Sequence, residues 1–312
     1  MSYGIESTLE ELLALRDDAK HLSFSARRMS LSQLAGRYAS HFRGRGMDYH
    51  ESRLYANGDD IRNIDWRVSA RTGKLHSKVF IEERERPVLI VADFSPSMYF
   101  ATRGAFKSVV AARLAALLAW YAGERGDRVG GLLFTPAGHP PTEQDIRPGS
   151  GRKPVLQILR ALAEATRLHA HTSGENRLID AVEHTRRVAR PGSLVLLISD
   201  FSCVRTPSRQ AAFQQALHPL SAHSDVMAFM ISDPIERALP ENRAVPLSNG
   251  RQRFRVGRAD RNSRQRLQRD YVSRHAWLVT EFGRLGQPVV PVSTQDRLLD
   301  ILNRPAHALK HA

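Results

Sequence analysis

The chain has 312 residues, of which 42% are hydrophobic and 25% charged, a balance typical of globular proteins with a substantial core. Its apolar runs last only a few residues, short of the ~20 that a membrane span needs. The single cysteine, Cys203, excludes an intrachain disulfide and a cysteine-based zinc site, and we expect a reducing cytoplasm. The formal net charge of +14 permits nucleic-acid binding, but the basic residues are spread along the whole chain, which argues against that function.

The N-terminal part predicts a helix followed by a short polar domain. Residues 5–20 have helical spacing of leucines, and Thr8 with Glu11 makes a capping box. Residues 74–82 alternate in polarity and predict a strand. We therefore expect two domains, with residues 1–86 forming the N-terminal helix and segment and residues 87–312 the main domain.

A dense polar string, which runs from Gly58 to Trp66, lies within that segment. Its acidic residues are Asp59, Asp60 and Asp65, and arginines are interleaved with them at 62, 67 and 71. The acids could form a second cation site or serve as catalytic carboxylates. Paired acids take part in acid–base catalysis only if their environments push their pKa values apart. A buried or half-buried ion-pair network around Trp66 is the interpretation that we favour.

From residue 88 onward, strands and helices alternate. Residues 88–92 form a continuous apolar run, as expected for a strand buried on both faces. Further strands are predicted at 128–134, 194–198, 226–231 and 289–292, a Pro- and Gly-rich loop at 136–151, and a hairpin at 242–258. Helices are predicted at 104–122, 153–167, 177–189, 207–220, 259–285 and 295–302. The fold class is therefore α/β, with a doubly wound, mostly parallel sheet covered by helices on both faces.

Two of these strands deliver an aspartate at their carboxyl ends, where open α/β sheets bind ligands. The strand at 88–92 ends in Asp93 and the strand at 194–198 leads to Asp200. Ser95 and Ser97 follow Asp93 at alternate positions. Carboxylate and hydroxyl oxygens suit hard cations such as Mg²⁺, so this loop predicts a divalent-metal site. The alternative is a strand-end turn in which Asp93 or Ser95 caps the next helix.

This loop, read as Asp93-Phe94-Ser95-Pro96-Ser97-Met98, resembles the metal-ion-dependent adhesion site of von Willebrand factor A-like domains. The upstream string, read as Gly58-Asp59-Asp60-Ile61-Arg62-Asn63-Ile64-Asp65-Trp66, resembles the signature of the domain-of-unknown-function fifty-eight family. The resemblance implies Mg²⁺ or a similar ion bound through Asp93, Ser95 and Ser97, with Asp200 as the second carboxylate. Such sites also take a threonine from a later loop, and here either Asn176 or Thr172 stands near that place.

Relatives of that family are commonly encoded beside MoxR-type AAA+ ATPases and are thought to act with them as adaptors or chaperone-like factors. The resemblance therefore implies a non-enzymatic, metal-dependent protein-binding module. The sequence has no phosphate-binding Gly-x-x-x-x-Gly-Lys-Ser/Thr loop, no Gly-x-Ser-x-Gly elbow and no His-Glu-x-x-His motif. Two alternatives stay open: a metal-dependent hydrolase that uses the same oxygen ligands, and a basic nucleic-acid-binding protein.

Overall fold

The computed structural model describes residues 4–23, 47–56, 59–82, 87–134, 143–167, 176–237, 245–248, 253–256 and 261–304. The described parts of residues 1–31 and 86–312 make one compact unit, here called the sheet unit. Those of residues 32–85 make a second, here called the small unit. Among the described residues, no helix has both the length and the apolar character needed to cross a membrane.

The sheet unit is built on six strands. From edge to edge they are β10 (Val289–Ser293), β7 (Asp225–Ser232), β6 (Leu194–Ser199), β3 (Pro87–Asp93), β4 (Arg128–Phe134) and β5 (Glu143–Gly149). Every neighbouring pair is parallel except β4 and β5. Counted in chain order from β5, the sheet reads 3-2-1-4-5-6, so the chain reverses direction across the sheet between β3 and β6. The predicted doubly wound α/β fold is confirmed.

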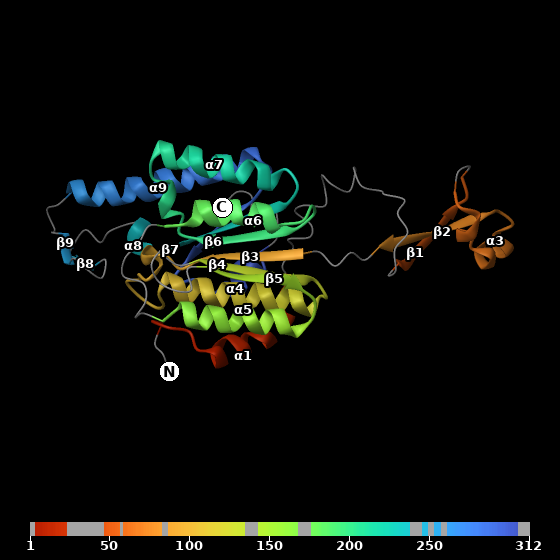
Figure 1. Cartoon of the computed structure of the whole chain (residues 1–312), viewed down its shortest axis with the longest axis horizontal. Helices are drawn as coiled ribbons and strands as arrows, with labels where there is room; N and C mark the ends of the chain where they lie inside the picture. Colours follow the sequence, from red (N-terminus) through yellow and green to blue (C-terminus); the bar gives the residue numbers. More distant parts are fainter. Residues whose placement is uncertain are drawn as a thin grey trace. The chain divides into compact units, whose positions relative to one another are not determined.

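Helices cover both faces of this sheet (Figure 1). One face carries α1 (Leu9–Lys20), α4 (Lys107–Glu124), α5 (Arg152–Ala165) and α10 (Leu298–Leu302). The other carries α6 (Leu178–Val188), α7 (Pro207–Ser221) and α9 (Arg261–Arg284). The short helix α8 (Pro234–Arg237) follows β7 and contacts α9. The predicted hairpin is also present, as β8 (Val245–Ser248) paired with β9 (Arg253–Val256).

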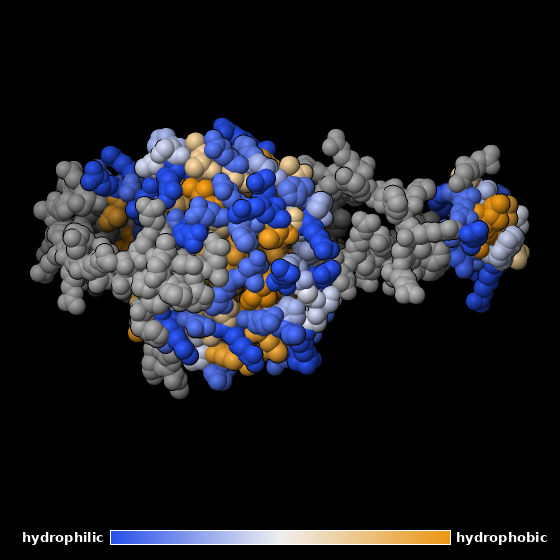
Figure 2. Space-filling model, in the orientation of Figure 1, coloured by the Kyte–Doolittle hydropathy of each residue, from blue (hydrophilic) through white to orange (hydrophobic). Residues whose placement is uncertain are grey.

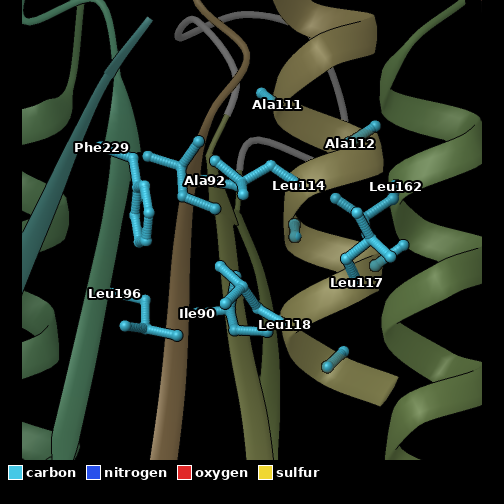
Figure 3. Packing of buried hydrophobic residues seen from close by; sticks show 14 of the residues in the cluster. Ile90, Ala92, Ala111, Ala112, Leu114, Leu117, Leu118, Leu162, Leu196 and Phe229 are labelled. Atoms are coloured by element: carbon cyan, nitrogen blue, oxygen red, sulfur yellow. The ribbon is translucent and has the colours of Figure 1, made fainter. Parts of the chain in front are cut away.

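The central strand β3 feeds two separate cores because successive side chains of a strand point to opposite faces. Its Ile90 and Ala92 lie in the core beneath α4, whereas Val91 lies in the core beneath α6 and α7. Figure 3 shows Ile90 among the leucines of α4. Fourteen of the eighteen α4 residues are buried, as expected for a helix that is apolar on nearly all sides. These two cores fix the carboxyl end of β3 in place.

Helix α1 belongs to the sheet unit, although the predicted division grouped it with residues 1–86. Its Leu12 is fully buried, and the carbonyl of Leu12 accepts a hydrogen bond from Nε1 of Trp120 on α4 at 3.1 Å. Arg16 pairs with Glu124 at 2.7 Å. The amphipathic pattern predicts the helix itself, but it does not say which distant surface that helix covers.

One element of the sheet contradicts the prediction. Residues 136–151 read as a Pro- and Gly-rich loop, whereas the structure places strand β5 at Glu143–Gly149, antiparallel to β4. Pro148 lacks a backbone N–H and is tolerated in this strand because β5 is the last strand of the sheet and needs partners on one side only.

Candidate functional site

The candidate site lies where β3 and β6 end side by side, at the point where the strand order reverses. Asp93 is the last residue of β3, and Asp200 directly follows β6. The two residues are 0% and 1% exposed. The parallel pairing of the two strands therefore brings together two aspartates that are 107 residues apart in the sequence, as predicted.

The carboxylate of Asp93 is held by three donors from three segments. Its Oδ1 accepts the backbone N–H of Ser95 at 2.8 Å. Its Oδ2 accepts the hydroxyl of Ser199 at 2.5 Å and Nδ2 of Asn176 at 3.0 Å. Burial and the nearby charge of Asp200 raise the pKa of Asp93 to about 6, although these hydrogen bonds oppose that rise. Asp93 is thus a buried carboxylate whose oxygen atoms are held in a fixed orientation.

A row of hydroxyl groups connects the Asp93 loop with the Asp200 loop. The Oγ of Ser95 lies 3.3 Å from that of Ser97, which lies 3.0 Å from that of Ser202. Ser95 is buried, whereas Ser97 and Ser202 are partly exposed. The row therefore runs from the buried Asp93 toward solvent, and Ser97 is the point at which an external group can reach it.

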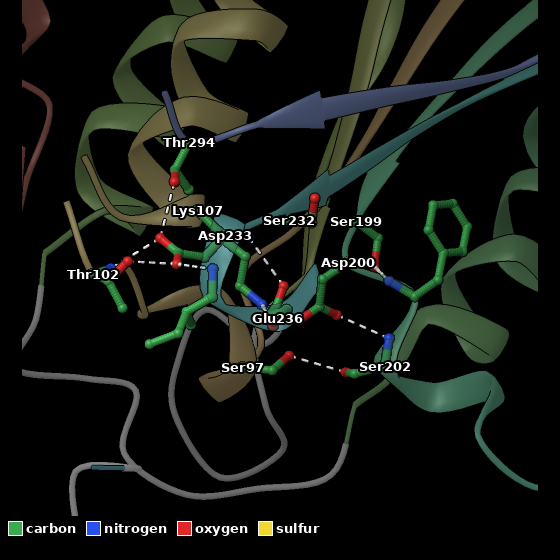
Figure 4. A network of polar contacts seen from close by, with 12 residues as sticks. Ser97, Thr102, Lys107, Ser199, Asp200, Ser202, Ser232, Asp233, Glu236 and Thr294 are labelled. Carbon is green, nitrogen blue, oxygen red and sulfur yellow. Dashed lines mark hydrogen bonds and ion pairs between the residues drawn. The ribbon is translucent and has the colours of Figure 1, made fainter. Parts of the chain in front are cut away.

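Asp200 is paired with a lysine that the sequence analysis did not identify. Its Oδ2 lies 2.8 Å from Nζ of Lys107, and its Oδ1 accepts the backbone N–H of Ser202 at 2.9 Å (Figure 4). Burial alone would raise the pKa of Asp200, but the charges of Lys107 and Arg274 outweigh it and hold that pKa well below its usual range. The carboxylate of Asp200 is therefore ionised, and the positive charge of Lys107 already compensates its negative charge.

A third strand end continues the same network. Asp233 directly follows β7 and is fully buried. It accepts hydrogen bonds from Thr102 Oγ1 at 2.6 Å and Thr294 Oγ1 at 2.9 Å, and its backbone N–H donates to Glu236 at 3.0 Å. Figure 4 shows these groups next to the Lys107 pair.

The sequence carries a local signal for this third strand end. Ile198-Ser199-Asp200 recurs as Ile231-Ser232-Asp233, each at the end of a buried strand. The repeat marks both strand ends and includes Ser199, which contacts Asp93. Lys107 and Ser202 had no comparable local pattern.

Asn176, one of the two candidates for the further ligand, lies beside Asp93 and Ser95. Its Nδ2 contacts Asp93 and, at 3.0 Å, Oγ of Ser95. Its Oδ1 accepts the backbone N–H of Leu178 at 2.9 Å, at the start of α6. These hydrogen bonds orient the amide with its nitrogen toward the site. Asn176 therefore holds the side-chain oxygens of Asp93 and Ser95 in position and does not offer a metal ligand of its own. Thr172 lies outside the described residues.

The residues present suit a hard divalent cation in donor type. Asp93, Ser95 and Ser97 offer one carboxylate and two hydroxyl oxygens, which Mg²⁺ prefers. Within the described ranges, no group of three or more His, Cys, Asp or Glu side chains is arranged to hold a metal, so such a site depends on the serine hydroxyls. Lys107 adds a positive charge at Asp200, which opposes a second cation.

The acidic string of the small unit has a structural role and lies in a different unit. The small unit contains β1 (Met47–Leu54), β2 (His76–Glu82), a short 3₁₀ helix (Ile61–Asn63) and α3 (Trp66–Thr72). The acids cap these helices or pair locally: Asp60 accepts from the N–H of Arg62 at 3.0 Å, Asp65 from that of Val68 at 3.1 Å, and Asp59 lies 2.6 Å from Arg53.

The expected buried or half-buried ion-pair network does not surround Trp66, which is 66% exposed. The carboxylates cap helix starts instead, and an indole at the first position of α3 points away from the small core. Gly58, the first residue of the string, lies outside the described residues.

Comparisons with known proteins identify relatives but no activity. The model of the family described as "Protein of unknown function DUF58" matches residues 51–276. Uncharacterized proteins of Mycobacterium bovis and Mycobacterium tuberculosis are 31% identical over 198 residues, which is 64% of this chain and 59% of theirs. The matched region thus spans less than two thirds of these relatives. A solved von Willebrand factor type A protein from Catenulispora acidiphila covers 50% of this chain and 35% of its own, with 15% identity and a TM-score of 0.27.

Proposed function

This chain belongs to the DUF58 family of proteins of unknown function, and from that premise we propose that it is a non-enzymatic, metal-dependent protein-binding module. Asp93, Ser95 and Ser97 would hold Mg²⁺ or a similar divalent cation at the carboxyl edge of the sheet. The bound ion would supply an electrophilic coordination position for an acidic side chain of a partner.

One observation supports this proposal most directly: the loops after β3 and β6 meet through their side-chain oxygens. The 3.0 Å contact between the hydroxyls of Ser97 and Ser202 joins the two loops at the switch point of the sheet. Ligands of open α/β sheets bind at such points, outside the carboxyl ends of the strands. The row of hydroxyls begins beside a buried carboxylate and reaches partly exposed Ser97 and Ser202, where a partner group can approach.

The remaining polar groups favour binding over proton transfer. Asp93, Asp200 and Asp233 each accept hydrogen bonds or an ion pair from the chain itself. A general base of a hydrolase would instead need to face its substrate water within hydrogen-bond reach. These contacts support a positioning role for the described carboxylates.

A MoxR-type AAA+ ATPase is the partner that we propose, on the family resemblance of the Gly58–Trp66 string. The chain would act as its adaptor, and nucleotide hydrolysis would belong to the ATPase. The formal charge of +14 supports an acidic partner surface, because long-range attraction accelerates such encounters. On the face shown in Figure 2, the described surface is largely hydrophilic with small separate apolar patches, which suits a polar contact.

The test is capture of partners from a native extract by the full-length chain, with Mg²⁺ and with a chelator. The wild type should recover a MoxR-type ATPase only in Mg²⁺, and Ser97→Ala should lose it. Asp180→Ala, which changes an exposed acid on α6, is the control and should behave as the wild type. Identical partners from all samples in both conditions would refute metal-dependent binding. Mg²⁺-dependent turnover of a phosphate ester, abolished by Asp93→Ala, would favour the hydrolase.

A further inference from the structure

We propose that Lys107 is a built-in cation that competes with a divalent ion for Asp200 and thereby keeps the affinity of the free site low. The inference rests on the proposed function, since it concerns the same site. It assigns a role to a residue that neither the motif nor the family match identifies.

The geometry of Lys107 is that of a shared counter-ion. Its Nζ lies 2.8 Å from Asp200 Oδ2 and 2.8 Å from Glu236 Oε1, and its side chain is 1% exposed (Figure 4). Arg274 of α9 is 4% exposed and adds a second positive charge to the surroundings of Asp200. The carboxylate that would complete a cation site is therefore already bound by the chain.

The position of Lys107 goes against its local preference. It is the first residue of α4, an 18-residue helix whose positive dipole end disfavours a cation there. A buried ammonium also loses its hydration, and only well-placed carboxylates offset that cost. Asp200 and Glu236 do so here. Departures of this kind from local preference concentrate at functional sites.

The consequence for cation binding follows from charge. An ion held by Asp93, Ser95 and Ser97 would meet Asp200 with its negative charge cancelled by Lys107, so the site lacks one effective negative charge. An acidic side chain of a partner would restore that charge. The free chain should therefore bind Mg²⁺ weakly, and the cation and the acidic partner should bind more tightly together than either does alone.

The experiment is calorimetric titration of the full chain with Mg²⁺ at pH 7. Lys107→Met removes the competing charge and should tighten Mg²⁺ binding roughly tenfold or more. Lys107→Arg keeps the charge and should bind as the wild type does. Arg113→Met is the matched control: it removes a paired cation from the same helix, where Arg113 contacts Glu11 of α1, and should leave Mg²⁺ affinity unchanged.

A second variant works in the opposite direction and preserves the buried lysine. Glu236→Gln leaves Lys107 with Asp200 as its charged partner, so it should weaken Mg²⁺ binding by a few-fold. This variant keeps the proposal falsifiable if Lys107→Met does not fold.

The possible outcomes separate the two proposals. Mg²⁺ binding by the wild type that Lys107→Met does not tighten, or that Glu236→Gln does not weaken, overturns the role of Lys107 and leaves the proposed function standing. No Mg²⁺ binding by any variant, including Lys107→Met in its folded state, overturns both.

Discussion

The side chain of Asn176 joins the start of α6 to the candidate site through its two ends. Its Nδ2 donates to Oδ2 of Asp93 at 3.0 Å, and its Oδ1 accepts the backbone N–H of Leu178 at 2.9 Å. This amide holds a strand end and a helix start in register with each other. The role is one of positioning, because the oxygen atom faces the helix and not the site.

Asn176→Ala should therefore destabilise the fold by about 1–2 kcal/mol, because it removes both a helix-start acceptor and a donor to a buried carboxylate. The free energy of unfolding from urea denaturation measures this change. Gln215→Ala on the exposed face of α7 is a suitable control and should have little effect. Equal stabilities of the two variants would show that Asn176 contributes no such link.

Removing the charge of Asp200 should cost more, since it leaves Lys107 buried with one carboxylate fewer. We expect Asp200→Asn to lower the free energy of unfolding by about 3 kcal/mol, the range found when one partner of a buried pair is lost. Asp180→Asn breaks an exposed pair with Arg177 and should not change stability measurably. Similar losses in both variants would argue that the Lys107 pair is not a buried ion pair.

The contact between α7 and α9 should make the free energy of unfolding depend on pH in a defined direction. Burial of Glu281 would raise its pKa, but hydrogen bonds from His218 and Gln214 outweigh burial and hold the pKa below the ordinary 4.5. A depressed pKa contributes stability above pH 4.5, and this contribution disappears as the pH falls through the lower pKa of the folded state.

Comparison of Glu281→Gln with the wild type isolates this contribution. The difference between their free energies of unfolding should shrink as the pH falls below 4.5, because Glu281 then loses its charge in the folded state as well. Glu183→Gln, at an exposed position of α6, should show no such trend. A difference that grows as the pH falls below 4.5 would contradict the lowered pKa of Glu281.

The small unit should lose order when its main cap is removed. Asp65 accepts hydrogen bonds from the N–H of Val68 and, at 2.6 Å, from the hydroxyl of Ser52, which ties α3 to β1. Asp65→Ala should accelerate hydrogen exchange across α3 while exchange in the sheet unit stays unchanged. Faster exchange in both units would mean that they unfold together.

The sheet and its two central aspartates could be predicted because their signals are local. The apolar runs before Asp93 and Asp200 are short, continuous and followed by helices, a pattern that few structures other than buried parallel strands produce. Once both strands belong to one sheet, their ends meet at one edge. Ser95 and Ser97 could be predicted as site residues for the same reason, because they directly follow Asp93 in the sequence.

The remainder of the site depends on long-range contacts that no local pattern encodes. Lys107 reaches Asp200 across 93 residues, so it is an ordinary polar residue until the fold is known. Asn176 was a candidate only through the family resemblance, and its contact with Asp93 spans 83 residues. The repeated Ile-Ser-Asp at 198–200 and 231–233 was the one readable clue to the third strand end. Strand β5 was missed because Pro148 and Gly149 indicate a loop unless the strand is known to lie at an edge.

The most direct test of the central claim is a crystal of the full chain soaked in Mn²⁺, with anomalous data collected at the manganese edge. The proposed site predicts one strong anomalous peak within about 2.5 Å of the hydroxyl oxygens of Ser95 and Ser97 in the wild type. That peak should be absent in Ser97→Ala. A wild-type map without a peak at these hydroxyls, or an unchanged peak in Ser97→Ala, would contradict the claim that this loop holds a divalent cation.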